Sequence, residues 1–424
     1  MSAVASLVER IPLRAREPSR RYRIAMVAAC PMPARRGTPL RVEKLAQALW
    51  NRGHHVELIT YHIADAAHVF EHPVHRIFSD TVYWNMPAGP NVRKLALYDP
   101  ALAFKLWRVL AHGEFDLIHA HHVEGLLASL PARYQTGTPL VYDAHTMLAS
   151  ELPSYGPKRS RSFVQRVGGW FDGVLPRRAD HVVSVTSDIR DRLVNDHGID
   201  AKKVSVVTNG VEMDRFLVPP QAPDSIVRII YSGTLATYQD IDLLLEAFAR
   251  AWRMRSDLRL VFSVSSSFRP YSAQVARLGI KDAVEVIPDN FEELPMRLAG
   301  AAMAVVPRTK CDGIPQKLLN YMAAGKAIVC SAGSAKVIEN ERTGLVVPNG
   351  DVDAFARAML RIAANPSYAQ DLGAAAREHV AANYSWEQAA ERVESVYELV
   401  TADRDRGVPV RHRTESVAPV DSST

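Results

Sequence analysis

Short runs of β-branched and aliphatic residues alternate with longer amphipathic segments along most of the chain. The predicted strands cover residues 23–29, 55–60, 116–120, 139–142, 181–186, 204–208, 227–233, 258–264, 284–287, 302–306, 327–330 and 345–347. Between most of them, apolar residues recur at i, i+3, i+4 and i+7, the spacing of a helix with one buried face. This alternation predicts an α/β fold in which helices cover both faces of parallel sheets.

The first predicted helix illustrates the pattern. Pro39 suits a first helical turn and Gly53 suits the end of a helix. The apolar residues between them fall on one stripe: Val42, Leu45, Ala46 and Leu49. A single sheet of a dozen strands is improbable, and the proline-rich segment 217–225 lacks a strong period. We therefore expect two doubly wound domains, residues 22–216 and 217–384, and disordered segments at 1–21 and 403–424.

Composition narrows the class of protein. The chain has 424 residues, of which 47% are hydrophobic and 23% charged, values typical of a globular protein. Its cysteines, Cys30, Cys311 and Cys330, are too scattered for a disulfide framework, which favours a reducing compartment such as the cytoplasm. We expect neither a signal peptide nor a membrane-spanning helix, because no apolar run approaches about 18 residues. The net charge of +5 is too small to indicate nucleic acid, but it suits a phosphorylated ligand or an anionic membrane surface.

Candidate chemistry follows the strand ends, where open parallel sheets bind ligands. Gly37 lies in the segment ARRGTPL before the first helix, where helix amides favour an anion. Two histidine clusters, IHAHH (118–122) and YDAHT (142–146), each follow a strand. Their histidines suit ligand contact or proton handling, although an ordinary turn and structural histidines remain alternatives. Because no fixed ligand spacing accompanies them, we expect no metal.

The segment 308–351 is the most informative stretch. A strand ends, a loop carries Asp312, and a predicted helix carries Lys317 and Asn320. Asp312 and Asn320 are spaced to hold the two ends of a nucleotide-sized ligand, and Lys317 adds positive charge at the first helical turn. The alternative is a plain loop and helix in which Asp312 lies near the helix start for capping.

These motifs, in this order, make the chain resemble a family 4 glycosyltransferase with a GT-B fold, from about residue 22 to about residue 402. The resemblance is carried by GTPLRVEKLAQALWNRGHHVELIT, FDLIHAHH, PLVYDAHT, ADHVVSVTSDIRDRL, VSVVTNGVEMDRF, YSGTLATYQDIDLLLEAF, GIPQKLLNYMAAGKAIV and ENERTGLVVPNGD. It implies an N-terminal Rossmann-like acceptor domain and a C-terminal Rossmann-like nucleotide-sugar domain. It also implies a final helix, 385–402, that crosses back to the first domain.

The resemblance further implies sugar transfer with retention of configuration and without a divalent metal. It assigns catalytic positions to His145, near the reacting sugar and acceptor, and to Asp312, the first of the family's paired acids. The implied donor-binding residues are Gly37, Thr38, Gly233, Thr234, Arg308, Gly313, Ile314, Lys317, Leu318 and Asn320. The implied acceptor-side residues are His119, His121 and Asp143.

The chain departs from the family pattern at three positions. The second paired acid is Asn320, an amide that loses the charge-assisted hydrogen bond to ribose. Thr234 and Gln239 stand where many members carry an arginine and a lysine for the diphosphate. We expect Lys317, and after it Arg308, to supply the missing positive charge.

Two DxD sequences, 240–242 and 351–353, could form the metal-binding motif of a GT-A glycosyltransferase, but both are better explained as helix starts.

Three function classes remain. The chain is a nucleotide-sugar-dependent glycosyltransferase, a catalytically impaired binding or partner subunit of that fold, or a GT-B nucleotide-sugar epimerase. The acceptor would be a glycan, as in polysaccharide biosynthesis, a lipid-linked molecule or a small molecule.

A basic, aromatic segment at 157–180 gives a hypothesis about membranes. It places Phe163, Val167, Trp170, Phe171 and Val174 on one helical stripe, among several arginines. This pattern suits an interfacial helix at the inner face of an anionic membrane. A helix packed on the sheet with a solvated basic face explains the same pattern.

Overall fold

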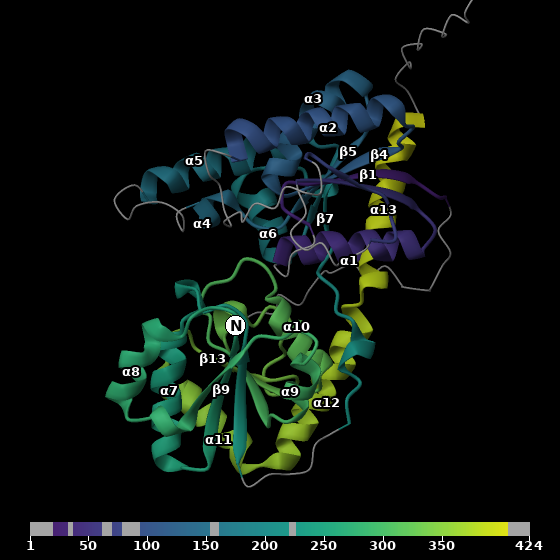
Figure 1. The fold of residues 1–424 in the computed structure, drawn as a ribbon. Helices are drawn as coiled ribbons and strands as arrows, with labels where there is room; N and C mark the ends of the chain where they lie inside the picture. The colour runs from purple at the N-terminus through teal and green to yellow at the C-terminus, as the bar shows by residue number, and fades with distance from the viewer. Residues whose placement is uncertain are drawn as a thin grey trace, which may run out of the picture.

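The structure, a computed structural model, describes residues 20–32, 37–61, 70–78, 94–152, 161–219 and 226–405. It consists of two α/β domains, one above the other in Figure 1. The predictions of disorder at both chain ends fall largely on residues 1–19 and 406–424, which lie outside the described residues.

The N-terminal sheet has seven strands in the order β3-β2-β1-β4-β5-β6-β7, and every pairing is parallel. The strands are β1 (Arg23–Ala28), β2 (His55–Thr60), β3 (Val74–Arg76), β4 (Leu117–His121), β5 (Leu140–Ala144), β6 (His181–Ser184) and β7 (Val204–Val206). The order reverses at β1 and β4, so ligands are expected at the carboxyl ends of these strands.

The C-terminal sheet has six parallel strands in the order β10-β9-β8-β11-β12-β13. They are β8 (Val227–Ser232), β9 (Leu258–Val264), β10 (Val284–Pro288), β11 (Met303–Val306), β12 (Ala327–Ser331) and β13 (Leu345–Val347). All twelve predicted strands are therefore present. Among the strands of the described residues, β3 was the one that the sequence did not predict; it has three residues, and none of its side chains is fully buried.

Helices cover both faces of the N-terminal sheet, as the pattern predicted. Ile24 and Met26 face a core formed with α1 and α13, whereas Ala25 and Val27 face a core formed with α2 and α3. This alternation follows from the two-residue period of a strand. The helices are α1 (Gly37–Asn51), α2 (Asp99–His112), α3 (His122–Thr136), α4 (Leu148–Glu151), α5 (Arg161–Val174) and α6 (Ser187–Asp191).

The C-terminal sheet is covered in the same way. Helices α7 (Ile241–Met254), α8 (Ser272–Leu278) and α11 (Val352–Ala364) build one core. Helices α9 (Leu294–Ala299), α10 (Gln316–Ala323) and α12 (Pro366–Asn383) build the other. The doubly wound α/β class predicted from the sequence is confirmed.

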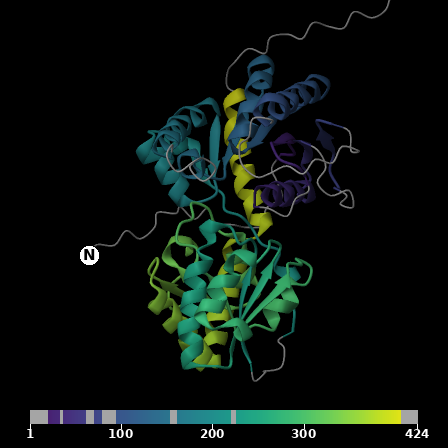
Figure 2. The same ribbon diagram turned by 60° about the vertical axis from the view of Figure 1, so that its left-hand side comes forward.

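The last helix, α13 (Trp386–Asp405), joins the two domains. It begins beside the C-terminal domain and runs along the N-terminal one, as its yellow ribbon shows (Figures 1 and 2). Trp386, Val393 and Tyr397 are buried in the N-terminal core. At its polar edge Glu394 accepts hydrogen bonds from Arg52, at 2.5 and 2.8 Å. None of the described helices is both long enough and apolar enough to cross a bilayer.

Candidate active site

The carboxyl ends of the two sheets face each other, and polar contacts join the domains there. The Thr186 hydroxyl, at the start of α6, donates to the carbonyl of Asp312 at 2.9 Å. Arg192 Nη1 lies 3.6 Å from the Asp312 carboxylate, and Lys336 pairs with Asp188. The two contacts of Asp312 hold the 308–315 loop of the C-terminal domain against the N-terminal domain, and the ion pair of Lys336 adds a further link.

His145 and Asp312, the predicted catalytic pair, come from opposite domains and meet in this region. His145 directly follows β5, and Asp312 precedes α10. A Cβ atom built on the neighbouring Gly313 would lie 3.8 Å from the His145 carbonyl oxygen. The Asp312 side chain keeps 32% of its surface exposed, so a ligand can reach its carboxylate.

Lys317 lies over the end of β8. Its Nζ donates to Gln239 Oε1 at 3.3 Å and lies 3.9 Å from the centre of the Tyr231 ring. Gly233, which has φ +116°, leaves the room that the ammonium group occupies, because a Cβ there would be 3.1 Å from Nζ. The amine thus lies beside Gln239, one of the two positions where the resemblance implied a missing positive charge. Arg308 is close by, 4.7 Å above the ring of Tyr238.

The surroundings of Lys317 hold its pKa far below that of an ordinary lysine. Burial of the amine, and after it the positive charge of Arg308, lowers the pKa to about 7. Asp289 opposes this shift without cancelling it. The amine is therefore poised to gain a proton when a negative group arrives.

The other predicted donor-binding residues differ in how far their side chains are exposed. Thr234 is exposed at the end of β8, and Asn320 lies on α10 with 6% of its surface exposed. Leu318 is completely buried, and its backbone amide already donates to the carbonyl of Pro315 at 2.9 Å. Position 318 thus lies on the inward face of α10, and its donor contact stays a prediction. Ile314 also packs into that core and is 8% exposed.

The predicted acceptor-side residues His119, His121 and Asp143 each have 0% exposure. Asp143 accepts hydrogen bonds from Arg41, whose Nη2 lies 2.8 Å from Oδ2 and whose Nε lies 3.1 Å from it. Burial raises the pKa of Asp143, but Arg41 and the neighbouring histidines together bring it well below its ordinary value. These side chains lie inside the protein next to His145, and their acceptor-side role stays a prediction.

His119, His121 and Asp143 are also the one metal-compatible grouping among the described residues. The Arg41 guanidinium lies 2.8 Å from the carboxylate oxygen that approaches both histidines. Its fixed positive charge opposes a cation at that position. The donor set therefore fits a metal poorly.

His145 is enclosed by polar partners on both ring nitrogens. Its Nε2 lies 3.1 Å from His121 Nδ1, and its Nδ1 lies 3.2 Å from the Thr38 hydroxyl. Burial lowers the pKa of His145 to about 3, and the opposing attraction of Asp143 does not restore it. His145 is thus a neutral histidine throughout the physiological pH range.

His122 belongs to the predicted histidine cluster 118–122, but the sequence did not single it out. It has φ +62°, and its Nδ1 pairs with Glu124 while its Nε2 lies 3.1 Å from Glu151. The two carboxylates raise its pKa well above the ordinary value despite burial. Its ring centre is 6.1 Å from that of His145. The run IHAHH contained a signal, but Glu151 lies 29 positions away and only the fold brings it near.

The two DxD sequences serve as helix starts. The Asp351 carboxylate accepts from the amide of Ala354 and caps α11. Asp240 precedes α7, but its carboxylate accepts from the amide and the hydroxyl of Thr309, both at 2.7 Å. Asp240 therefore positions the loop that carries Arg308 and Asp312.

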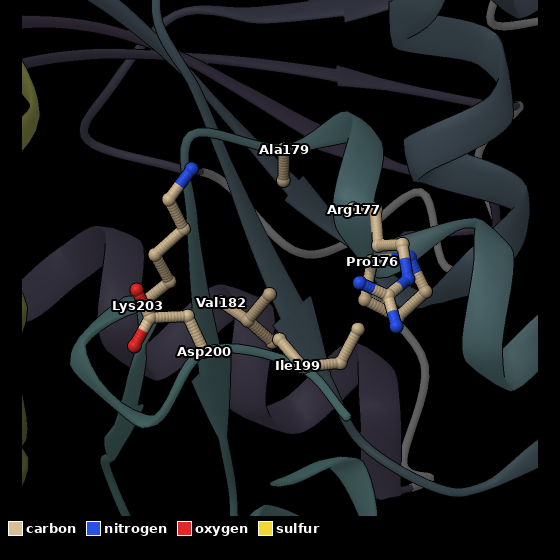
Figure 3. A pocket seen from close by; sticks show the side chains of 7 residues that line it. All are labelled: Pro176, Arg177, Ala179, Val182, Ile199, Asp200 and Lys203. Carbon is tan, nitrogen blue, oxygen red and sulfur yellow. The ribbon is translucent and has the colours of Figure 1, made fainter. Parts of the chain in front are cut away.

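A small hollow at the amino ends of β6 and β7 lies away from these residues (Figure 3). It is lined mainly by Arg177, Val182, Ile199 and Lys203. The Arg177 Nη2 group is engaged by the carbonyls of His197 and Gly198, at 2.6 and 3.2 Å. The hollow contains no residue predicted to act in catalysis.

Comparison with known proteins agrees with this geometry. The profile of Glycosyltransferase Family 4 matches residues 36–215, and that of Glycosyl transferases group 1 matches residues 226–365. The chain belongs to the family 4 glycosyltransferases. This family 4 glycosyltransferase is 26% identical over 399 residues to the D-inositol 3-phosphate glycosyltransferase of Streptomyces scabiei, covering 87% of this chain and 88% of that protein. It is 25% identical over 390 residues to the enzyme of the same name from Thermobifida fusca, covering 85% and 88%.

Solved structures show the same fold. The sucrose-phosphate synthase of Thermosynechococcus elongatus aligns with a TM-score of 0.74 at 20% identity, over 90% of this chain and 100% of that one. Anabaena Alr3699/HepE, solved with UDP and glucose, aligns with a TM-score of 0.67 at 16% identity, over 88% and 99%. The GT-B architecture of this family 4 glycosyltransferase is thereby confirmed.

Proposed function

We propose that this glycosyltransferase moves a sugar from a nucleoside diphosphate donor to a hydroxyl-bearing acceptor, with retention of configuration and without a metal. The observation that carries the proposal is the approach of His145 to the Asp312–Gly313 segment from the opposite domain, where the next helix of the C-terminal domain carries the amine of Lys317. This arrangement provides separate groups for the sugar, the acceptor and the leaving diphosphate.

Each group has a task that its environment suits. Lys317 and Arg308 stabilise the negative charge that develops on the departing diphosphate. Asp312, partly exposed, accepts hydrogen bonds from hydroxyls of the donor sugar. His145 is neutral and both of its ring nitrogens have partners within the protein, so its backbone carbonyl, without a charge, helps to position the reacting sugar. Asn320 forms hydrogen bonds with the ribose hydroxyls through its side-chain amide, where many members of the family use a carboxylate.

The comparisons supply the first donors and acceptors to try. Anabaena Alr3699/HepE was solved with UDP-glucose, so UDP-sugars are the first donors. The relatives named D-inositol 3-phosphate glycosyltransferase make that phosphate the first small acceptor. Glycans and lipid-linked sugars, which would place the enzyme at the cytoplasmic face of a membrane, follow as acceptors.

A thermal-shift screen with UDP-, GDP- and ADP-sugars tests the proposal, followed by an assay for free nucleoside diphosphate with and without acceptor. A bound donor raises the unfolding temperature by mass action. A donor that binds without turnover in the presence of any acceptor favours an impaired partner subunit, the alternative that Thr234, Gln239 and Asn320 motivate. Turnover without an acceptor that yields an isomeric nucleotide sugar favours an epimerase.

We further propose that α5 touches an anionic membrane. Phe163 and Trp170 lie one heptad apart on this helix and are 69% and 62% exposed, and Arg166 is exposed between them. The opposite side of α5 packs on α4, where Asp172 accepts from the amides of Leu148 and Ala149 at 2.9 Å. The helix is therefore anchored, while its aromatic residues remain available to a bilayer.

Flotation with phosphatidylglycerol-containing vesicles at low salt tests this contact. Trp170→Ser should weaken binding about tenfold, since burying such a side chain contributes roughly 1.5–3 kcal/mol. Met254→Ser is the matched control, because Met254 is 78% exposed on α7 of the other domain. Equal flotation of both variants and the wild type, or no flotation of the wild type, contradicts the membrane contact.

A further inference from the structure

A chain of buried polar groups connects α13 to the first turn of α1 through His145. Tyr397 Oη lies 2.7 Å from His119 Nδ1, and the rings of His119 and His121 stack with centres 4.4 Å apart. His121 Nδ1 lies 3.1 Å from His145 Nε2, and His145 Nδ1 lies 3.2 Å from Thr38 Oγ1. Thr38 is the half-buried end of this chain, so the direction of its hydrogen bond matters for any ligand nearby.

The number of protons on the two central histidines is fixed by burial. Burial lowers the pKa of both His121 and His145, so each ring is neutral and carries one N–H. Only one proton can lie between His121 Nδ1 and His145 Nε2. Either His121 donates it and the proton of His145 is on Nδ1, or His145 donates it and the proton of His121 is on Nε2.

The unpartnered nitrogen of His121 distinguishes these arrangements. Among the described residues His121 Nε2 has no hydrogen-bond partner, and the ring is completely buried. A buried N–H without an acceptor costs more free energy than a buried ring nitrogen without a donor. An unprotonated Nε2 is therefore favoured in His121. Asp143 does not discriminate, because it lies 3.6 Å from His121 Nδ1 and 3.5 Å from His145 Nε2. The structure therefore favours an N–H on His121 Nδ1 and on His145 Nδ1.

We propose that His145 Nδ1–H donates to the Thr38 hydroxyl, which in turn donates its own proton to the diphosphate of the donor. In this arrangement Thr38 is a ligand-contacting residue, and His121 is a positioning residue that acts through His145. A hydroxyl whose lone pair already accepts from His145 has its proton available, and phosphate oxygens of the ionised diphosphate are acceptors. Thr38 also lies in the first turn of the fifteen-residue α1, where backbone amides favour the same negative group. The role of Thr38 rests on the proposed function.

Two measurements test this proposal. The first is the ring ¹⁵N spectrum of the wild-type protein, with the His145 signals assigned by their loss in His145→Gln. We expect the pattern of an Nδ1–H ring that persists from pH 6 to pH 8. His121→Phe keeps an aromatic ring stacked on His119 but removes the N–H that donates to His145. The ¹⁵N chemical shifts of His145 should therefore move toward those of the Nε2–H tautomer. An Nε2–H pattern in the wild type overturns the proposal.

The second measurement is the UDP dissociation constant of Thr38 variants. Thr38→Val keeps the shape but loses the hydroxyl and should weaken UDP binding at least tenfold, whereas Thr38→Ser should bind UDP within about threefold of the wild type. Thr136→Val, on α3, is the matched control and should bind UDP like the wild type. If the wild type binds UDP and Thr38→Val binds it equally well, only the role of Thr38 is contradicted. A wild type that binds neither UDP, GDP nor ADP contradicts the proposed function as well, and the ¹⁵N pattern still decides the tautomer.

Discussion

If Lys317 binds the diphosphate, nucleotide binding should take up a proton. The free amine has a pKa lowered to about 7, so it is about half protonated at pH 7 and about 10% protonated at pH 8. A bound diphosphate favours the charged form and raises that pKa. Because the bound state holds more protons than the free state, affinity must fall as pH rises above about 7.

The magnitude follows from the same value. If the bound amine stays protonated, the dissociation constant of UDP should rise about 50-fold between pH 7 and pH 9. The last ionisation of the diphosphate, near pH 6, is already about 90% complete at pH 7 and adds little to this change. Titration calorimetry at pH 8 in two buffers of different ionisation enthalpy should show an uptake of about 0.9 proton for each UDP bound.

Two variants separate Lys317 from other causes. Lys317→Arg carries a permanent charge and should abolish both the pH dependence and the proton uptake. Lys310→Ala removes an exposed lysine from the loop that precedes α10 and should leave both unchanged. A wild-type dissociation constant that varies less than threefold from pH 7 to pH 9, with no proton uptake, refutes the role of Lys317 in binding the diphosphate.

Three further predictions concern other parts of the protein. His145→Ala should fold, as judged by circular dichroism and thermal unfolding, but lose sugar transfer by a factor on the order of 100; full activity would remove His145 from the site. His122 has a raised pKa in the folded state, so its stabilising effect should be complete below about pH 6.5 and disappear as pH rises through the folded pKa. The free energy of unfolding in urea should therefore be lower for His122→Gln than for the wild type at pH 6, and the two values should converge at alkaline pH. An equal difference at both pH values would contradict this. In Gly373→Ala the new Cβ would lie 2.1 Å from the Gly325 carbonyl oxygen, so unfolding free energy should fall by about 1–3 kcal/mol while the folded protein keeps its UDP affinity.

The strands and the class of fold could be predicted because most buried strands are short segments rich in β-branched and aliphatic residues, separated by helical patterns. Parallel strands covered on both faces require this pattern, and it is visible in a single sequence. The three-residue β3 does not display it, since its central residue is polar and none of its side chains is fully buried.

The partners of the polar site residues could not be predicted in the same way. Asp143 stands at a strand end, where the sequence indicates ligand contact, yet Arg41, 102 positions earlier, neutralises it inside the protein. Buried charge needs a partner, and nothing local in the sequence shows which residue provides one. The contact between Lys317 and Gln239 is equally invisible, because 78 positions separate them.

The path of α13 affects how the protein is made. Trp386, Val393 and Tyr397 complete the core of a domain whose last strand, β7, ends at residue 206. The ribosome must synthesise roughly 180 further residues after β7 before it reaches the first of these three residues, which takes about 9–36 s at 5–20 residues per second. During that interval Ile24, Met26 and Val42 lack part of their apolar cover. The N-terminal domain begins to emerge first, but it cannot complete its core until the rest of the protein has been synthesised.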